Sequence, residues 1–460
     1  MSISRLASAN RRFARFANCK IKIRGESLGL SYNIVTLGCK VNSCESAAIA
    51  SGMERLGFVR AEEGEIADIS IINSCAVTGM AVTKTRHAVS RCKRDNPSCV
   101  TVLCGCFPQC FPEEAGLRWG ADIVVGNSNK GRLPEIISEY LEKRIKTVKV
   151  PQMTRQYDES AAVPDVDRTR AFIKVEDGCD NFCAYCIIPT ARGRVRSLAP
   201  EKITEQSLEC VRSGHKEIVL TGINLCCYGE ELGLKLSDAV KACAESGVER
   251  IRLSSLEPER MTDEEISALK SVPQLCPHFH LSLQSGSDTV LKRMNRRYDT
   301  EEFMRIVDKL RGEFPNCSVT TDIIAGFPGE TDEEFQQTME FVKRVQFSKI
   351  HVFPYSIREG TIAAEMKQVP PTVRSDRTRA LSDFAKGLEF TFFGTQLNTE
   401  HTVLVEKPRS EDYSVGFTEN YLPVRIYGKP VLPRHSLVKV RITDYTKEYC
   451  IGKIVKVDNK

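Results

Sequence analysis

The feature that most constrains the fold is a regular alternation of short apolar runs and helical segments between residues 170 and 360. Each run is rich in β-branched residues and is followed by a helical pattern. Successive runs begin about 30–45 residues apart, which is the spacing of βα units in a parallel sheet. Six such units predict an α/β fold with a partial (β/α)6 barrel, whose functional residues lie at the carboxyl ends of the strands. The predicted strands are 171–175, 217–221, 250–254, 278–283, 318–324 and 349–353.

A shorter α/β segment precedes these units. Apolar runs at 33–37, 69–72, 100–103 and 123–125 alternate with helix-like stretches such as 45–56 and 82–94, which predicts a small parallel sheet. The polar segment that follows is predicted to be a linker. The chain is therefore divided into a basic extension 1–30, an N-terminal α/β domain 31–146, a linker 147–168, a barrel domain 169–392 and a C-terminal domain 393–460.

The C-terminal domain has short alternating runs at 401–406, 421–426, 437–443 and 449–457, separated by prolines and a glycine. This pattern predicts a small all-β barrel. Residues 429–460 hold eight Lys or Arg and three Asp or Glu, so their net charge of +5 equals that of the whole chain. Positive charge on a small β-barrel suits contacts with RNA phosphates, and nearby aromatic residues are candidates for stacking on bases. These aromatic residues are Tyr413, Phe417, Tyr421 and Tyr427.

Nineteen cysteines are many for a chain of 460 residues. No secretory signal precedes them and their number is odd, so metal or redox chemistry is expected rather than a disulfide framework. The sequence contains no apolar run of 18 or more residues, so no membrane span is predicted. Residues 1–25 hold seven basic residues and no acid, which is typical of a basic tail or of an organellar transit peptide. A cytoplasmic protein is the main expectation.

Three cysteines, Cys179, Cys183 and Cys186, lie in one short loop after the first predicted barrel strand. Three thiolates at this spacing can ligate three irons of a cubane [4Fe–4S] cluster and leave the fourth iron open for another ligand. A structural zinc site would require a fourth protein ligand, and no suitable residue follows closely. The loop is therefore predicted to hold a [4Fe–4S] cluster with one open iron.

Three further cysteines, Cys39, Cys75 and Cys106, each follow a predicted strand of the N-terminal domain. The carboxyl ends of parallel strands share one edge of a sheet, so these distant thiols can converge. Three converged thiolates again suit a [4Fe–4S] cluster with one open iron. The alternatives are that these residues are buried thiols, or that Cys104 or Cys110 is the real ligand.

The spacing of Cys179, Cys183 and Cys186, with Tyr185 before the last cysteine, resembles that of the radical S-adenosylmethionine (SAM) superfamily. From Ser31 onward, the chain is similar to the methylthiotransferase family within that superfamily. The resemblance implies an auxiliary [4Fe–4S] cluster on three N-terminal cysteines, a SAM-cleaving cluster in the barrel, and an RNA-binding TRAM domain at the C-terminus. The motifs that carry it fall on Gly38, Cys39 and Asn42, on Asn73, Cys75 and Val77, on Gly105, Cys106 and Gln109, and on Pro189, Arg192 and Gly193.

The resemblance also implies a pocket for SAM and substrate at the barrel mouth. Tyr185 and the loops after the second, third and fourth barrel strands are expected to line it. His280 and His351 lie on predicted strands and are interpreted as packed rather than catalytic. The candidate lining residues of those loops are Gly222, Asn224, Ser254, Ser255 and Gln284.

Within the family, the sequence around Cys39, with Lys40, Val41 and Asn42, is most similar to the branch that acts on threonylcarbamoyladenosine at tRNA position 37. This similarity implies methylthiolation of C2 of that base: one SAM is cleaved to a 5′-deoxyadenosyl radical, and a second SAM donates the methyl group. The implied partners of this monomeric enzyme are tRNA, an electron donor such as flavodoxin or ferredoxin, and a sulfur source. The alternatives are isopentenyladenosine in tRNA or a ribosomal protein as the substrate, and a non-enzymatic RNA-binding iron–sulfur protein.

Overall fold

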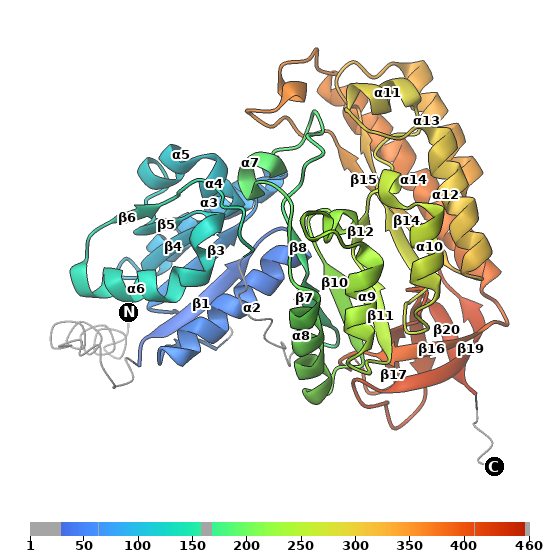
Figure 1. Cartoon of the computed structure of the whole chain (residues 1–460), viewed down its shortest axis with the longest axis horizontal. Helices are drawn as coiled ribbons and strands as arrows, with labels where there is room; N and C mark the ends of the chain where they lie inside the picture. Colours follow the sequence, from blue (N-terminus) through green and yellow to red (C-terminus); the bar gives the residue numbers. More distant parts are fainter. Residues whose placement is uncertain (1–28, 63, 158–167, 409, 456–460) are drawn as a thin grey trace, which may run out of the picture.

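The computed structural model describes residues 29–62, 64–157, 168–408 and 410–455, which form three domains in chain order (Figure 1). The basic residues predicted to form an N-terminal extension lie outside the described residues, as do 158–167 of the predicted linker. Two lysines of the basic C-terminal segment, Lys456 and Lys460, also lie outside them. Among the described residues, no helix has the length and apolar character needed to cross a membrane.

The N-terminal domain is built around one parallel sheet of six strands, in the order β2-β1-β3-β4-β5-β6. Four strands match the predicted runs, and β2 and β6 are short additions at the two edges. The segment predicted to be a linker therefore begins with a strand, because β6 pairs in parallel with β5. The strands are β1 (Ser31–Thr36), β2 (Val59–Arg60), β3 (Ile69–Ser74), β4 (Val100–Gly105), β5 (Ile123–Val125) and β6 (Thr147–Lys149).

Helices cover both faces of this sheet, which explains why its central strands are apolar on both sides. β3 and β4 are buried along their whole length. Ile49 of α2 and Ile137 of α6 pack on one face, and Val89 of α3 and Ala115 of α5 pack on the other. The helices are α2 (Lys40–Arg55), α3 (Gly79–Asp95), α4 (Cys106–Cys110), α5 (Pro112–Leu117) and α6 (Leu133–Lys143), with a 3-10 turn at Asn127–Arg132.

The central domain confirms the predicted partial barrel. Six parallel strands form two groups, β7-β10-β11 and β13-β14-β15, and the short β12 joins them because it follows β11 and pairs with β13. Outward side chains such as Ile218 and Phe279 pack under the surrounding helices, whereas His280 and Thr320 line the interior. The strands are β7 (Ala171–Lys174), β10 (Glu217–Thr221), β11 (Arg250–Leu253), β12 (Ser255–Leu256), β13 (His278–Leu281), β14 (Ser318–Ala325) and β15 (Lys349–Pro354).

The helices of the central domain lie on its outer side (Figure 1). A short antiparallel pair, β8 (Glu176–Asp177) and β9 (Arg196–Ser197), frames the cysteine loop that follows β7. The helices are α7 (Ile188–Arg192), α8 (Pro200–Arg212), α9 (Leu236–Ala244), α10 (Asp263–Lys270), α11 (Asp288–Arg293), α12 (Thr300–Glu313), α13 (Asp332–Val345) and α14 (Pro371–Thr395).

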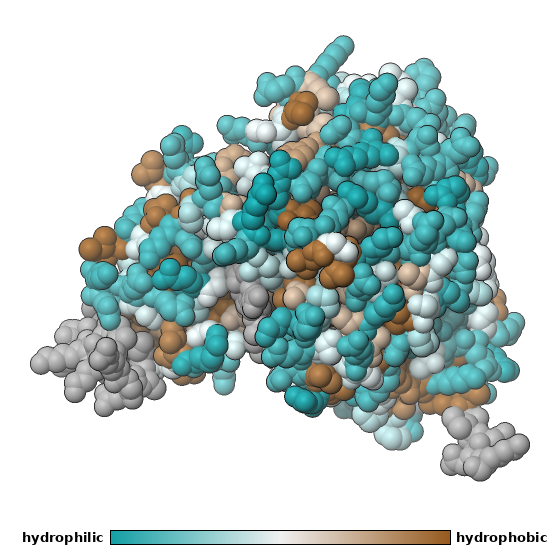
Figure 2. Space-filling model, viewed as in Figure 1, coloured by the Kyte–Doolittle hydropathy of each residue, from teal (hydrophilic) through white to brown (hydrophobic). Residues whose placement is uncertain are grey.

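The C-terminal domain is a closed barrel in the order β16-β17-β18-β20-β19, which confirms the predicted small all-β barrel. It includes β17, a strand that the sequence analysis did not predict, whose side chains alternate between buried and half-buried positions. On the face drawn in Figure 2, hydrophilic residues dominate and hydrophobic ones are scattered. The strands are β16 (Glu400–Val405), β17 (Tyr413–Phe417), β18 (Pro423–Tyr427), β19 (Leu437–Tyr445) and β20 (Cys450–Ile454).

The C-terminal barrel packs against the amino-terminal ends of the central strands. Tyr421 stacks on His278, with ring centroids 4.9 Å apart, and the Arg252 guanidinium lies 4.6 Å from the Tyr421 ring. Phe417 stacks on Tyr421 and lies 4.9 Å from the Arg170 guanidinium. The expectation that Phe417 and Tyr421 stack on RNA bases stays a prediction, because their rings have partners in this domain interface but both residues also line a cavity and Tyr421 is 37% exposed.

Candidate active site

Cys39, Cys75 and Cys106 lie directly after β1, β3 and β4, which are neighbouring strands of the N-terminal sheet. Cys39 immediately precedes α2, which begins earlier than predicted, and Cys106 is the first residue of α4. The charge of each thiol lies close enough to influence the pKa of another. The structure thus brings these three predicted residues together at one edge of the sheet.

Two glycines allow the cysteine loops to approach one another. Gly38 and Gly105 both have a φ of 104°, in the region that favours glycine. A Cβ added to Gly38 would lie 2.8 Å from the Cβ of Cys75, and one added to Gly105 would lie 2.6 Å from the carbonyl oxygen of Ser74. A side chain at position 38 or 105 would therefore collide with the neighbouring loop.

The donor set at this edge fits an iron–sulfur cluster. Burial raises the pKa of Cys39 and raises that of Cys75 to about 11, while the nearby Arg192 lowers both. Cluster ligands must be thiolates, so this environment needs compensating positive charge, which irons bound between the thiols would add to that of Arg192. Three converged thiolates suit a [4Fe–4S] cluster with one open iron.

Of the two other candidate cysteines, Cys110 packs beside Cys106 and remains an alternative ligand, whereas Cys104 faces the core of the sheet. Cys104 lies within β4 and is fully buried in the apolar core, whereas Cys110 ends α4, one turn after Cys106. The side-chain amide of Asn127 donates to Cys106 Sγ at 3.5 Å and to the carbonyl oxygen of Ala191 at 2.6 Å. Asn127 thereby ties Cys106 to the central domain.

The second cysteine loop lies at the carboxyl end of β7. The Asn224 amide donates to Cys179 Sγ at 3.6 Å, and Arg296 Nη1 donates to Cys183 Sγ at 3.2 Å. Burial raises the pKa of all three thiols, and that of Cys179 reaches about 12. These donors favour the thiolate forms of Cys179 and Cys183, so the loop, which ends with Cys186, also fits a [4Fe–4S] cluster with one open iron.

The two cysteine loops lie side by side, because α4 packs on α7 (Figure 1). Cys106 of α4 and Ala76 contact Ile187 and Ala191 of the segment that follows Cys186. The two sets of thiols, although they belong to different domains, therefore flank one contact between those domains.

A buried network of charges lies beside this contact. Arg192 is fully buried, and its guanidinium bonds to both carboxylate oxygens of Glu45, at 2.8 and 3.1 Å, and to Asp177 at 3.0 Å. Burial alone would raise the pKa of both carboxyls, but the surrounding cations hold that of Glu45 well below its usual range and that of Asp177 at about 2. The further cations of this network are Lys130 and Lys174 beside Glu45, and Arg196 beside Asp177.

A cavity of about 860 Å³ lies inside the central barrel, and this volume suits a ligand of nucleoside size or larger. Cys39 and Lys40 of the N-terminal domain line it, so the auxiliary cysteine site opens into the barrel. Gly222, Ser254 and Ser255, three of the predicted pocket residues, also line it. The sequence analysis missed Lys40 as a cavity residue, because contact between the two domains places it there.

The other three predicted pocket residues do not line this cavity within the described structure. Asn224 contacts Cys179, as described above. Tyr185 packs edge-on against Phe327, with ring centroids 6.3 Å apart. Gln284 has a φ of 66°, and its backbone pairs with that of β14 through Asp322. Asn224 therefore contacts the second cysteine loop, and Tyr185 belongs to it. Gln284 instead pairs with β14 just beyond the end of β13.

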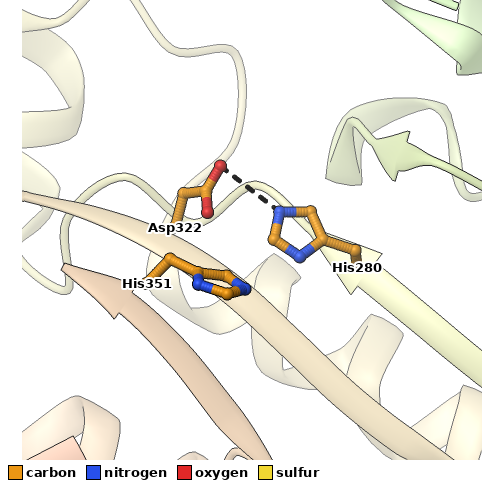
Figure 3. Close-up of side chains that lie close together, drawn as sticks. All are labelled: His280, Asp322 and His351. Carbon is orange, nitrogen blue, oxygen red and sulfur yellow. Dashed lines mark ion pairs between the residues drawn. The ribbon is translucent and has the colours of Figure 1, made fainter. Parts of the chain in front are cut away.

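His280, Asp322 and His351 face the cavity from β13, β14 and β15, and Figure 3 shows their side chains close together. His280 Nε2 lies 3.3 Å from Asp322 Oδ2, and His280 Nδ1 lies 2.9 Å from Thr320 Oγ1. Burial lowers the pKa of His351. The interpretation of the two histidines as packed residues is corrected. Polar residues at alternate strand positions were a signal for this face, but such a pattern does not reveal which face encloses a cavity.

Comparisons with known proteins first define the class. The family model of the radical SAM superfamily matches residues 173–342, and the model of the uncharacterized protein family UPF0004 matches residues 31–126. Among solved structures, the radical SAM methyltransferase TsrM from Kitasatospora setae aligns with a TM-score of 0.54 and 12% identity, covering 73% of this chain and 77% of that one. The fold is therefore that of a radical SAM protein.

Curated relatives then define the family. The threonylcarbamoyladenosine tRNA methylthiotransferase MtaB of Bacillus subtilis is 40% identical, over 92% of this chain and 96% of its own length. MtaB of Thermotoga maritima is 41% identical, over 91% and 96%. The tRNA-2-methylthio-N(6)-dimethylallyladenosine synthase of Carboxydothermus hydrogenoformans is 36% identical, over 90% and 97%. The chain belongs to the methylthiotransferase family of radical SAM enzymes, which confirms the family and fold class expected from the sequence.

Proposed function

We propose that this protein attaches a methylthio group to C2 of N6-threonylcarbamoyladenosine at position 37 of tRNA, next to the anticodon. The observation that carries the proposal is the placement of two sets of three cysteines beside one partial barrel, whose cavity carries polar side chains from three strands. The similarity to the threonylcarbamoyladenosine tRNA methylthiotransferases of B. subtilis and T. maritima supports this choice of substrate.

The cysteines would hold two [4Fe–4S] clusters. When bound, the clusters and two molecules of SAM per turnover supply the radical, sulfur and methyl-transfer chemistry. The protein's own residues bind and orient: Ser254 and Ser255 offer hydroxyls along the cavity wall, and Gly222 lets the Glu176 side chain pack closely beside that wall. We also propose an external electron donor, such as flavodoxin or ferredoxin, and an external sulfur source. The proposed ligands are Cys39, Cys75 and Cys106 for the auxiliary cluster, and Cys179, Cys183 and Cys186 for the SAM-binding cluster.

The tRNA is proposed to contact the C-terminal barrel. The Arg425 guanidinium lies 3.7 Å from the centre of the Tyr449 ring and 4.7 Å from that of Tyr413, and the exposed Tyr427 lies beside Tyr413. A surface of arginine and tyrosine can contact phosphates and stack on unpaired bases. Tyr413 and Tyr427, two of the four aromatic residues expected to stack on bases, lie on this surface.

An anaerobic assay tests the function. The reconstituted protein is supplied with SAM, dithionite and tRNA that carries either threonylcarbamoyladenosine or dimethylallyladenosine, and the digested nucleosides are analysed by mass spectrometry. The 2-methylthio product is expected from the first tRNA only. Cys39→Ala and Cys183→Ala should each abolish it, whereas Cys243→Ala, which alters a cysteine buried between α8 and α9, should retain it.

Each other outcome of this assay has a definite meaning. If product forms only from the dimethylallyladenosine tRNA, the proposed substrate is wrong and dimethylallyladenosine, as named for the C. hydrogenoformans relative, takes its place. Formation of 5′-deoxyadenosine without any methylthio nucleoside would retain the radical chemistry and reject the proposed tRNA substrates. Full activity of Cys39→Ala would reject the auxiliary cluster assignment.

A further inference from the structure

The interior of the central barrel carries polar side chains from three adjacent strands. They come from alternate positions of β13, β14 and β15, and they face the cavity of about 860 Å³. Enclosing such groups costs free energy unless they bind one another or a ligand. Several of these groups bind one another, and the wall they form offers hydrogen-bonding groups to a polar ligand. These residues are His278, His280, Thr320, Asp322, Lys349 and His351.

Lys40 differs from Asp322 and Lys349, two other charged groups of this cavity. Asp322 pairs with His280, and Lys349 Nζ lies 2.8 Å from a carboxylate oxygen of Glu389. Lys40 makes no hydrogen bond or ion pair with the residues that the structure describes. Its ammonium group offers three donors, which are available to an anion in the cavity.

The ammonium group of Lys40 lies near the polar wall of the cavity. Its charge acts on Asp322 at the cavity wall and on His278 at the base of the cavity. Because Lys40 directly follows Cys39, an anion bound to its side chain would be held beside the auxiliary cysteine site. Lys40 is exposed and lines this cavity, so its ammonium group is accessible to a ligand there.

We propose that Lys40 binds the carboxylate of the modified base and thereby selects an anionic N6 substituent over an apolar one. This inference rests on the proposed function, because a threonylcarbamoyl group carries a carboxylate and a hydroxyl, whereas a dimethylallyl group carries neither. An apolar substituent would remove water from the ammonium group without replacing it by an anion. A site built for a polar partner rejects analogues that lack this partner.

A divalent cation is the rival occupant of this region. The ligand atoms of His280, Asp322 and His351 lie within 4.8 Å of one another. However, the positive charge of Lys40 acts on the same aspartate and would repel an added cation. The balance of charge therefore favours an anionic ligand at the Lys40 end of the cavity.

The test compares three full-length variants. Lys40→Gln removes the charge, Lys40→Arg keeps it, and Lys241→Gln removes the same charge from the outer surface of α9, where Lys241 is half exposed. Each protein is titrated with tRNA that carries threonylcarbamoyladenosine and with the same tRNA after its carboxylate is converted to a methylamide. The Kd is measured without SAM, KM and kcat are measured from methylthio product, and bound iron is measured for every variant.

The wild-type protein and Lys241→Gln should prefer the carboxylate over the methylamide by about 10–100-fold in Kd. Lys40→Gln should lose this preference, with an increase in KM rather than a decrease in kcat, and Lys40→Arg should recover most of it. The iron measurement separates this result from loss of a cluster beside Cys39.

Three results would overturn the inference. If the wild type forms the methylthio product and Lys40→Gln keeps the preference, Lys40 does not bind the carboxylate, although the proposed function stands. If the preference disappears with EDTA and returns with zinc, a metal ion holds the carboxylate instead. If the wild type forms no product from either tRNA and binds both equally, the proposed function and the role of Lys40 both fail.

Discussion

Replacing Glu45 by glutamine should strongly destabilise the N-terminal domain. The Glu45 side chain is only 9% exposed and forms ion pairs with three cations. These cations are Lys130, Lys174 and Arg192. Arg192 donates to both of its oxygens, at 2.8 and 3.1 Å, and Lys174 Nζ lies 3.5 Å away. Glutamine keeps the shape of the side chain but removes the only negative charge that these three cations share.

The charges of the network set the size of the effect. It contains four cations and two carboxylates, so the loss of Glu45 raises its excess positive charge, whereas the loss of Arg192 lowers it. Breaking a buried ion pair by removing one partner costs about 3–5 kcal/mol. We therefore expect Glu45→Gln near the upper end of this range and Arg192→Met near the lower end.

The single tryptophan of the chain provides the assay. Trp119 belongs to the N-terminal domain and stacks on Phe107, with ring centroids 4.0 Å apart, so its fluorescence reports the unfolding of this domain. In urea, with a slope of about 2 kcal/mol per molar, the midpoint should fall by roughly 2.5 M for Glu45→Gln and by roughly 1.5 M for Arg192→Met. Reduced protein without clusters is used, so that cluster loss does not contribute.

The order of the two variants is the decisive result. A shift below about 0.5 M for Glu45→Gln would show that water or local rearrangement compensates the cations, and that the network is not a dry, buried one. If the urea midpoint falls further for Arg192→Met than for Glu45→Gln, the excess of positive charge does not determine the stability of this network. Lys149→Gln, which breaks an exposed pair with Glu139, is the control and should shift the midpoint by little.

Acid should weaken the same network: because the pKa of Glu45 is held well below its usual range, its contribution is complete above about pH 4.3 and is lost as the pH falls further. The wild-type urea midpoint should therefore fall more steeply than that of Glu45→Gln between about pH 5 and pH 3. Cys39→Ala and Cys183→Ala should each retain about half of the wild-type iron, because each removes a ligand of one cluster only; full iron in either variant would show that this cysteine is not a ligand. Arg425→Ala should weaken the binding of all tRNAs alike and reduce the slope of log Kd against log salt by about 1, measured by filter binding; an unchanged slope would exclude a phosphate contact.

The sequence by itself determined the class of fold and the two sets of cysteines. Strand and helix periodicities are local, so the six βα units of the barrel are visible without any tertiary contact. Cys179, Cys183 and Cys186 occupy one loop, and their proximity follows from spacing alone. Cys39, Cys75 and Cys106 are far apart in the chain, yet their convergence was predictable because parallel strands end at one edge.

Only the tertiary structure decided how the domains meet and what faces the cavity. Glu45 and Arg192 are 147 positions apart, and no local pattern links them. Phe417 and Tyr421 have the composition of an RNA-binding surface, but their rings pack on side chains of the neighbouring domain. The alternation of β13, β14 and β15 places His280, Asp322 and His351 on one face. Whether that face packs or encloses a cavity depends on how far the barrel closes, which is a property of the assembled sheet and not of any single strand.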